Sequence, residues 1–247
     1  MRIPTPVRRS DEPVTQHQHT EAGHVPTGRW VRDLVFGAND GLVAAFAVVS
    51  GVHGAAVSPR IVLLAGFAEL IGGTIAMGLG AFLAVKSERE FVASERAREE
   101  REVREFPEVE RAEVRGIFAA KGYQGQALDT IVEHVTADPK FWVDTMMNEE
   151  LGLAAVPGGS PVRSGLMTGL AYALGAAMPV LPYALPIDVN RGFIGSAVLT
   201  LLALFGAGAF KTTMTGRPWL RSGFESAAIG ALAAAATFAA GRLIAAA

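Results

Sequence analysis

Several long stretches of this sequence contain no Asp, Glu, Lys or Arg. They cover residues 41–59, 164–187, 192–210 and 226–241, and residues 61–85 carry a single charge, Glu69. A helix needs about 20 mostly apolar residues to cross a hydrocarbon core about 30 Å thick. We therefore predict an all-α membrane protein with five membrane-spanning helices, at about 34–54, 61–85, 164–184, 192–212 and 224–244, of which the Ala-rich last one is the least hydrophobic.

The composition excludes several classes of protein. The uneven charge distribution is not that of an ordinary soluble globule. A net charge of -2 without a predominantly basic patch argues against a nucleic-acid partner. The absence of cysteine excludes disulfides, thiolate metal sites and cysteine nucleophiles. No nucleophile–base pair and no His cluster at metal-ligand spacing is evident, so a membrane enzyme ranks last among the functions considered, and no prosthetic group is expected.

Basic residues beside the spans predict their orientation. Arg29 and Arg32 precede the first span, and Lys211, Arg217 and Arg221 lie between the fourth and fifth. Because short cytoplasmic flanks are enriched in Lys and Arg, the N-terminus and the segment between spans two and three are predicted to be cytoplasmic. The C-terminus is predicted to lie outside. Arg residues far outnumber Lys residues, and both Ala and Gly are abundant. This composition is typical of bacterial proteins and indicates a bacterial inner membrane.

The chain divides into four predicted parts. Residues 1–28 form a disordered polar tail with three His to which no role is assigned, and 29–85 contain the first two spans. Residues 86–162 form a cytoplasmic helical metal-binding insert, and 163–247 contain the last three spans. Within the insert, the second span is predicted to continue as one helix to Glu105, followed by helices at 108–121, 125–136 and 139–151.

The insert concentrates carboxylates. Acidic residues outnumber basic ones by 16 to 10 over 86–162. Glu99 and Glu102 share one helix face, as do Glu110 and Glu113 on the next helix, and Pro107 between them lets the two pairs converge. Carboxylates that repel one another are stable together only with cations or protons between them. The alternative is a solvated, salt-bridged helix surface.

Two methionines add a softer type of ligand. Met146, Met147 and Glu150 lie within one helical turn. A thioether beside carboxylates favours Fe²⁺ or a neighbouring transition ion over Mg²⁺ or Ca²⁺. The alternative is that both methionines pack with Trp142 in a hydrophobic core.

Ionisable groups inside a membrane span are costly and usually face the bundle interior. Asp40 lies about two turns into the first span, and Glu69 lies near the middle of the second. Met77 is two turns further along, on roughly the same side as Glu69. The alternatives are that Asp40 caps a helix start and that Glu69 is a protonated, structural hydrogen-bonding group.

The chain resembles the vacuolar iron transporter family, which includes prokaryotic members. The resemblance runs from Arg32 to the C-terminus and rests on DLVFGANDGL at 33–42, AMG at 76–78 and MMNEELGL at 146–153 after Trp142. Five spans with a cytoplasmic helical insert between the second and third are also the layout of that family.

The resemblance implies proton-coupled transport of Fe²⁺ out of the cytosol by a homodimer in a lipid membrane. It implies metal ligands at the following insert positions: Glu99, Glu102, Glu110, Glu113, Met146, Met147 and Glu150. It implies a pathway through the membrane that uses Asp40, Glu69 and Met77. Mn²⁺ is the nearest alternative ion, and a membrane-anchored divalent-metal sensor or buffer without transport is the alternative function.

Overall fold

The computed structural model describes residues 27–153, 159–215 and 217–247, so almost all of the predicted tail lies outside the described residues. Every regular element in these ranges is helical and none is a strand, which confirms the predicted all-α class. The elements are α1 (Thr27–Gly54), α2 (Pro59–Glu105), α3 (Pro107–Ala120), α4 (Gly125–Thr136), α5 (Pro139–Glu149), α6 (Pro161–Val180), the 3₁₀ helix η1 (Leu181–Ala184), α7 (Val189–Thr215) and α8 (Trp219–Ala246).

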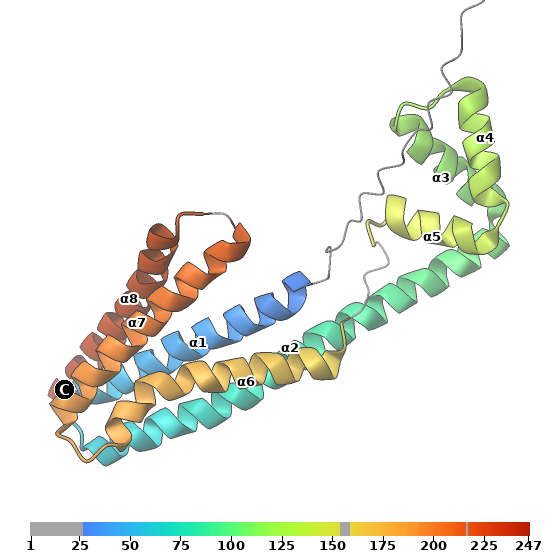
Figure 1. Cartoon of the computed structure of the whole chain (residues 1–247). Helices are drawn as coiled ribbons and strands as arrows, with labels where there is room; N and C mark the ends of the chain where they lie inside the picture. Colours follow the sequence, from blue (N-terminus) through green and yellow to red (C-terminus); the bar gives the residue numbers. More distant parts are fainter. Residues whose placement is uncertain (1–26, 154–158, 216) are drawn as a thin grey trace, which may run out of the picture.

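Five helices are long and apolar enough to cross a membrane, which confirms the predicted number of spans. They are the described helices α1, α2, α6 with η1, α7 and α8, and the Ala-rich α8 is among them. Figure 1 shows them as one bundle, from which α2 projects toward the group formed by α3, α4 and α5. At 1.5 Å per residue, the 47 residues of α2 span about 70 Å, more than twice the thickness of a hydrocarbon core.

Small residues bring α1 and α6 into backbone contact. A Cβ atom at Gly41 would collide with the carbonyl oxygen of Tyr172, and one at Gly175 would collide with that of Ala38. Such close helix crossings are typical of membrane bundles, where packing rather than water exclusion holds helices together. The contact fixes the α1 segment around Asp40 against α6.

The insert folds around its own hydrophobic core. Buried side chains from α2 to α5 form one cluster: Val103, Val114, Leu128, Val132, Val135, Trp142, Val143, Met146 and Met147. Ion pairs between Arg96 and Asp144 and between Lys121 and Glu149 join α5 to α2 and to the end of α3. These contacts set the insert helices in fixed positions on the projecting part of α2.

Local signals in the sequence set the ends of the insert helices. α2 ends at Glu105, as predicted, and α3 begins at Pro107, one residue before the predicted boundary. The side chain of Asp138 caps α5 by accepting a hydrogen bond of 3.0 Å from the backbone N–H of Lys140. Gly122 ends α3 with a positive φ of 96°, which an L side chain rarely adopts. α5 ends at Glu149, two residues before the predicted boundary.

Candidate functional site

Two glutamates of the insert are buried without full hydrogen bonding. Glu99 on α2 is 1% exposed, and Glu110 on α3 is 4% exposed. The Oε2 atom of each has no hydrogen-bond partner among the described residues. Because a buried carboxylate without a partner is costly, these two atoms mark a place where a cation or a proton would be stabilised.

The five predicted glutamates of the insert act on one another electrostatically. Burial raises the pKa of Glu110 to about 7, and repulsion from Glu113, Glu99, Glu102 and Glu150 adds to the rise. Burial also raises the pKa of Glu99, with repulsion from Glu150 and Glu102 contributing and the neighbouring Arg98 opposing it. The fold therefore brings together carboxylates from α2 and α3, as the spacing around Pro107 predicts, and adds Glu150 at the end of α5, which that spacing does not predict.

Glu150 completes the cluster from the C-terminal end of α5. Although the residue as a whole is exposed, partial shielding of its carboxyl from water is the largest cause of its raised pKa; repulsion from Glu113 and Glu102 adds to the rise and Arg98 opposes it. Arg98 is a cation within the cluster, with its guanidinium 2.9 Å from Glu95, 3.4 Å from Glu99 and 3.6 Å from Glu102. Its charge offsets only part of the repulsion, since the pKa values of Glu99 and Glu150 remain raised.

The cluster is open rather than closed into a coordination shell. Among the described residues, no group of three or more His, Asp or Glu side chains is arranged to hold a metal ion. Glu102 is half-buried, whereas Glu113 and Glu150 are exposed.

The two methionines of α5 lie in the core of the insert. Met146 is fully buried and Met147 is 5% exposed, and both pack in the cluster that includes Trp142 and Val143. This placement agrees with the alternative that they serve packing. Their role as metal ligands stays a prediction.

Inside the bundle, the predicted carboxylates of α1 and α2 lie near each other. The hydroxyl of Tyr172 on α6 donates a 2.5 Å hydrogen bond to Oε1 of Glu69. Asp40 is close enough to Glu69 for the two carboxylates to repel each other when both are ionised, and the Tyr172 hydroxyl lies near both. Asp40 lies in the interior of α1, so the alternative that it caps a helix start is wrong. Three helices thus contribute to one polar group within an apolar bundle.

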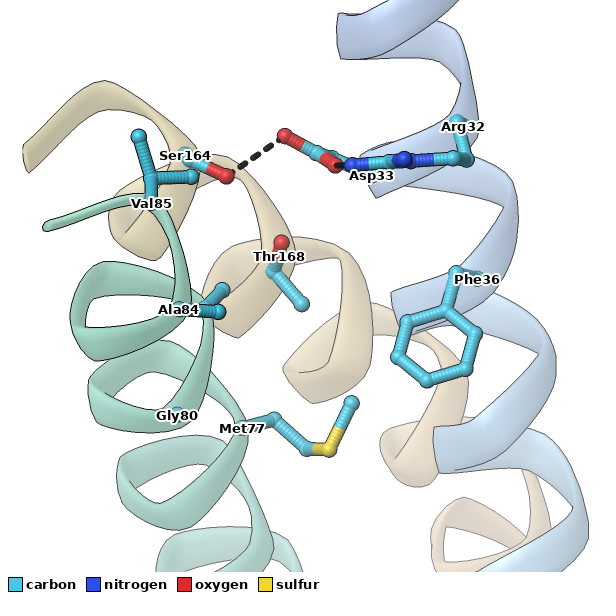
Figure 2. A pocket seen from close by; sticks show the side chains of 10 residues that line it. Arg32, Asp33, Phe36, Met77, Gly80, Ala84, Val85, Ser164 and Thr168 are labelled. Atoms are coloured by element: carbon cyan, nitrogen blue, oxygen red, sulfur yellow. Dashed lines mark hydrogen bonds and ion pairs between the residues drawn. The ribbon is translucent and has the colours of Figure 1, made fainter. Parts of the chain in front are cut away.

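Met77 lines a cavity of about 480 Å³ between α1, α2 and α6. Figure 2 shows Met77 projecting from α2 into this space, with Asp33 of α1 and Ser164 of α6 at the other end. The Ser164 hydroxyl donates a 2.7 Å hydrogen bond to Oδ2 of Asp33. Thr168 adds a second hydroxyl-bearing residue to the wall.

Sequence reasoning missed three polar residues of this region. Tyr172 lies in a charge-free stretch, where its hydroxyl is the one feature that could identify it as a polar residue of the bundle interior. Asp33 is seven residues before Asp40, a spacing that places both on one side of a helix. This spacing could have identified Asp33 from the sequence as a further residue of the same region. Ser164 has no such signal, because its contact with Asp33 joins residues 131 positions apart.

Comparisons with known proteins identify the family. The sequence matches the VIT family over residues 31–242. It is 43% identical to vacuolar iron transporter 1 of Arabidopsis thaliana over 220 residues, which cover 89% of this chain and 88% of that protein. It is 39% identical over 222 residues to vacuolar iron transporter 2 of Oryza sativa subsp. japonica, with 90% and 89% covered. It is 30% identical over 235 residues to the vacuolar iron transporter of Toxoplasma gondii, with 92% and 78% covered. The chain therefore belongs to the VIT family.

Proposed function

We propose that this protein transports Fe²⁺ across a membrane, from the side that carries the insert to the opposite side, in exchange for protons. The observation that carries the proposal is the polar group of Asp40, Glu69 and Tyr172 inside an apolar bundle. Intramembrane carboxylates are costly and usually mark an ion or proton path. The relatives named as iron transporters support Fe²⁺ as the ion.

The insert collects the ion in this proposal. Glu99 and Glu110 supply buried oxygens without partners, and Glu102, Glu113 and Glu150 supply movable carboxylates around them. Their mutual repulsion is relieved when a divalent cation binds, which favours capture of the ion from water. Met146 and Met147 remain candidate ligands that would have to leave their core positions to reach it.

Asp40, Glu69 and Met77 form the membrane part of the pathway. Both carboxylates can hold either a divalent ion or protons, because both states remove their mutual repulsion. Exchange of one state for the other is the basis of the proposed proton antiport. The thioether of Met77 offers a softer contact than oxygen, which favours Fe²⁺ over Mg²⁺ or Ca²⁺.

A second copy of the chain fits the outer face of α2. Exposed small residues recur there at every fourth position: Ala68, Gly72, Ala76, Gly80 and Ala84, of which Gly80 and Ala84 also line the cavity beside Met77, so this face borders the cavity. A Cβ atom at Gly72 or Gly80 would meet nothing within 4 Å. Small residues at this spacing let two helices pack closely in a membrane. This supports the proposed homodimer, with α2 at the interface.

The orientation in the membrane is also part of the proposal. Arg32, Lys211, Arg217 and Arg221 support a cytoplasmic location for the N-terminus and the insert, with the C-terminus outside. Transport then runs out of the cytosol. Composition remains the support for a bacterial inner membrane.

Transport by purified protein in liposomes tests the proposal. Wild-type vesicles are expected to take up Fe²⁺ faster when their interior is more acidic than the medium, because protons then leave as Fe²⁺ enters. The rate of Mn²⁺ uptake under the same conditions measures the preference between the two ions. Asp40→Asn keeps the shape of the side chain and removes its charge, so flux should fall to the level of empty vesicles while the insert still binds metal. Met77→Ala should reduce flux less, because a thioether is a weaker ligand and carries no proton.

The sensor or buffer alternative gives a different result. A protein that only stores or senses metal would bind Fe²⁺ through the insert and move none across the bilayer. Wild-type vesicles without flux above empty ones would refute transport. Wild-type rates in correctly folded Asp40→Asn protein would refute the pathway proposed here.

A further inference from the structure

The cavity beside Met77 has a polar end that the pathway described above does not use. Asp33 lines it and is nine-tenths buried, with 8% of the residue exposed. Ser164 and Thr168 are also buried and line the same wall. A volume of about 480 Å³ holds an ion with several water molecules, since each water occupies about 30 Å³.

One oxygen of the Asp33 carboxylate is weakly held. Oδ2 accepts the hydrogen bond from Ser164, whereas the interaction found for Oδ1 among the described residues is the guanidinium of Arg32 at 3.6 Å. That distance is too long for a hydrogen bond. The Arg32 side chain is also 72% exposed, so water and salt weaken the attraction. Figure 2 shows the carboxylate between these two partners at the upper end of the cavity.

Helix geometry places Asp33 in line with the membrane carboxylates. Asp33 and Asp40 are seven residues apart on α1, which puts them on one side of the helix with a rise of about 10 Å between them. On α2, Met77 and Glu69 are eight residues apart, also about two turns. Met77 shares a cavity with Asp33, and Glu69 interacts with Asp40. The candidate ligands therefore come alternately from the two helices along the bundle: Asp33 and Asp40 from α1, and Met77 and Glu69 from α2.

We propose that Asp33 binds the incoming metal ion at the mouth of the pathway, before the ion reaches Met77 and Asp40. This inference rests on the transport function proposed above. The ion approaches from the insert side, where α1 begins, and the Asp33 carboxylate exchanges its weak contact with Arg32 for a contact with the cation. The Ser164 hydroxyl bonds only Oδ2, so Oδ1 is the oxygen that meets the cation, and water entering the cavity completes the shell of the ion.

The competing explanation is that Asp33 and Ser164 only clamp α1 to α6. The two explanations differ in which chemical property matters. A clamp needs the hydrogen bond, which Asp33→Asn can retain through its amide oxygen. An ion site needs the negative charge, which Ser164→Ala leaves in place.

Fe²⁺ uptake into liposomes under reducing conditions, measured over a range of ion concentrations, separates them. Asp33→Asn should raise the half-saturating Fe²⁺ concentration at least about tenfold, because loss of even an indirect metal contact costs that much affinity. Ser164→Ala should leave this concentration within about twofold of wild type or lower it. Glu88→Gln is the matched control, since it removes an exposed carboxylate of α2 outside the cavity and should change nothing.

Each outcome decides the matter. An unchanged half-saturating concentration in Asp33→Asn overturns the proposal, and so does an equal rise in Asp33→Asn and Ser164→Ala. If Asp33→Asn does not fold, Ser164→Ala decides alone, because a tenfold rise there means a clamp and an unchanged or lower value supports the ion site. Wild-type vesicles without Fe²⁺ flux would contradict transport itself, whereas normal wild-type flux with an unaffected Asp33→Asn contradicts only the role of Asp33.

Discussion

The raised pKa of Glu110 makes metal binding by the insert depend on pH near neutrality. With a pKa of about 7, this carboxyl is about nine-tenths protonated at pH 6 and about one-tenth protonated at pH 8. A bound cation must displace the proton, so the apparent affinity is expected to fall about tenfold from pH 8 to pH 6. That change equals about 1.4 kcal/mol. A Glu with the ordinary value of 4.5 is ionised at both pH values and gives almost no change.

Calorimetry with Co²⁺ on the full chain in detergent measures this dependence. Glu110→Gln should weaken binding at pH 8 and make the remaining affinity much less sensitive to pH. Glu108→Gln, which changes an exposed carboxylate on the same helix, should behave like wild type. Wild-type affinities that agree within about twofold at pH 6 and pH 8 would refute the reasoning.

The same shift has a consequence for stability without metal. A carboxyl whose pKa is higher in the folded state binds more protons there than in the unfolded chain, so ionising it destabilises the fold. Its unfavourable effect therefore grows as the pH rises from about 4.5 through 7. We expect the thermal unfolding temperature of the metal-free protein to be lower at pH 8 than at pH 6, and Glu110→Gln to reduce the difference.

Two further predictions concern the bundle. Reporter fusions at the two ends of the chain should lie on opposite sides of the membrane, because five helices are long and apolar enough to cross it. Matching signals would mean that one of these helices does not cross. Gly41→Ala should destabilise the protein by about 1–3 kcal/mol in thermal unfolding, because the new Cβ collides with the carbonyl of Tyr172. Gly116→Ala on α3, where a Cβ meets nothing within 4 Å, should be neutral or slightly stabilising.

Local sequence signals were enough to predict most of the fold. Charge-free stretches gave the number of spans, because only burial in lipid tolerates them at that length. Proline and glycine gave the ends of the insert helices, since Pro107 and Gly122 act on the backbone within a few residues. These effects need no knowledge of how helices pack.

Contacts between distant segments could not be predicted in this way. The spacing of Glu99, Glu102, Glu110 and Glu113 predicts that they converge, but not that Glu99 and Glu110 are the buried members. Their burial depends on how the insert helices α2 to α5 pack around their common core. The hydrogen bond from Tyr172 on α6 to Glu69 on α2 joins residues 103 positions apart. Gly73 of α2 leaves the space that the Tyr172 ring occupies, because a Cβ atom there would collide with the Tyr172 hydroxyl.

The length of α2 constrains how the insert can serve transport. This one helix carries Met77 and Glu99, and it contains no Pro or Gly between residues 81 and 105. A rise of 1.5 Å per residue separates Met77 from Glu99 by about 33 Å. No side chain spans that distance, so within one chain an ion released by the insert cannot pass directly from one set of ligands to the other. In the proposed function, the insert therefore acts by raising the local ion concentration near the mouth of the bundle, and the first contact after release is a carboxylate at that mouth. The position of Asp33 meets this requirement. Asp33 lies in the second turn of α1 (Thr27–Gly54), and the N-terminal end of α1 faces the insert in Figure 1.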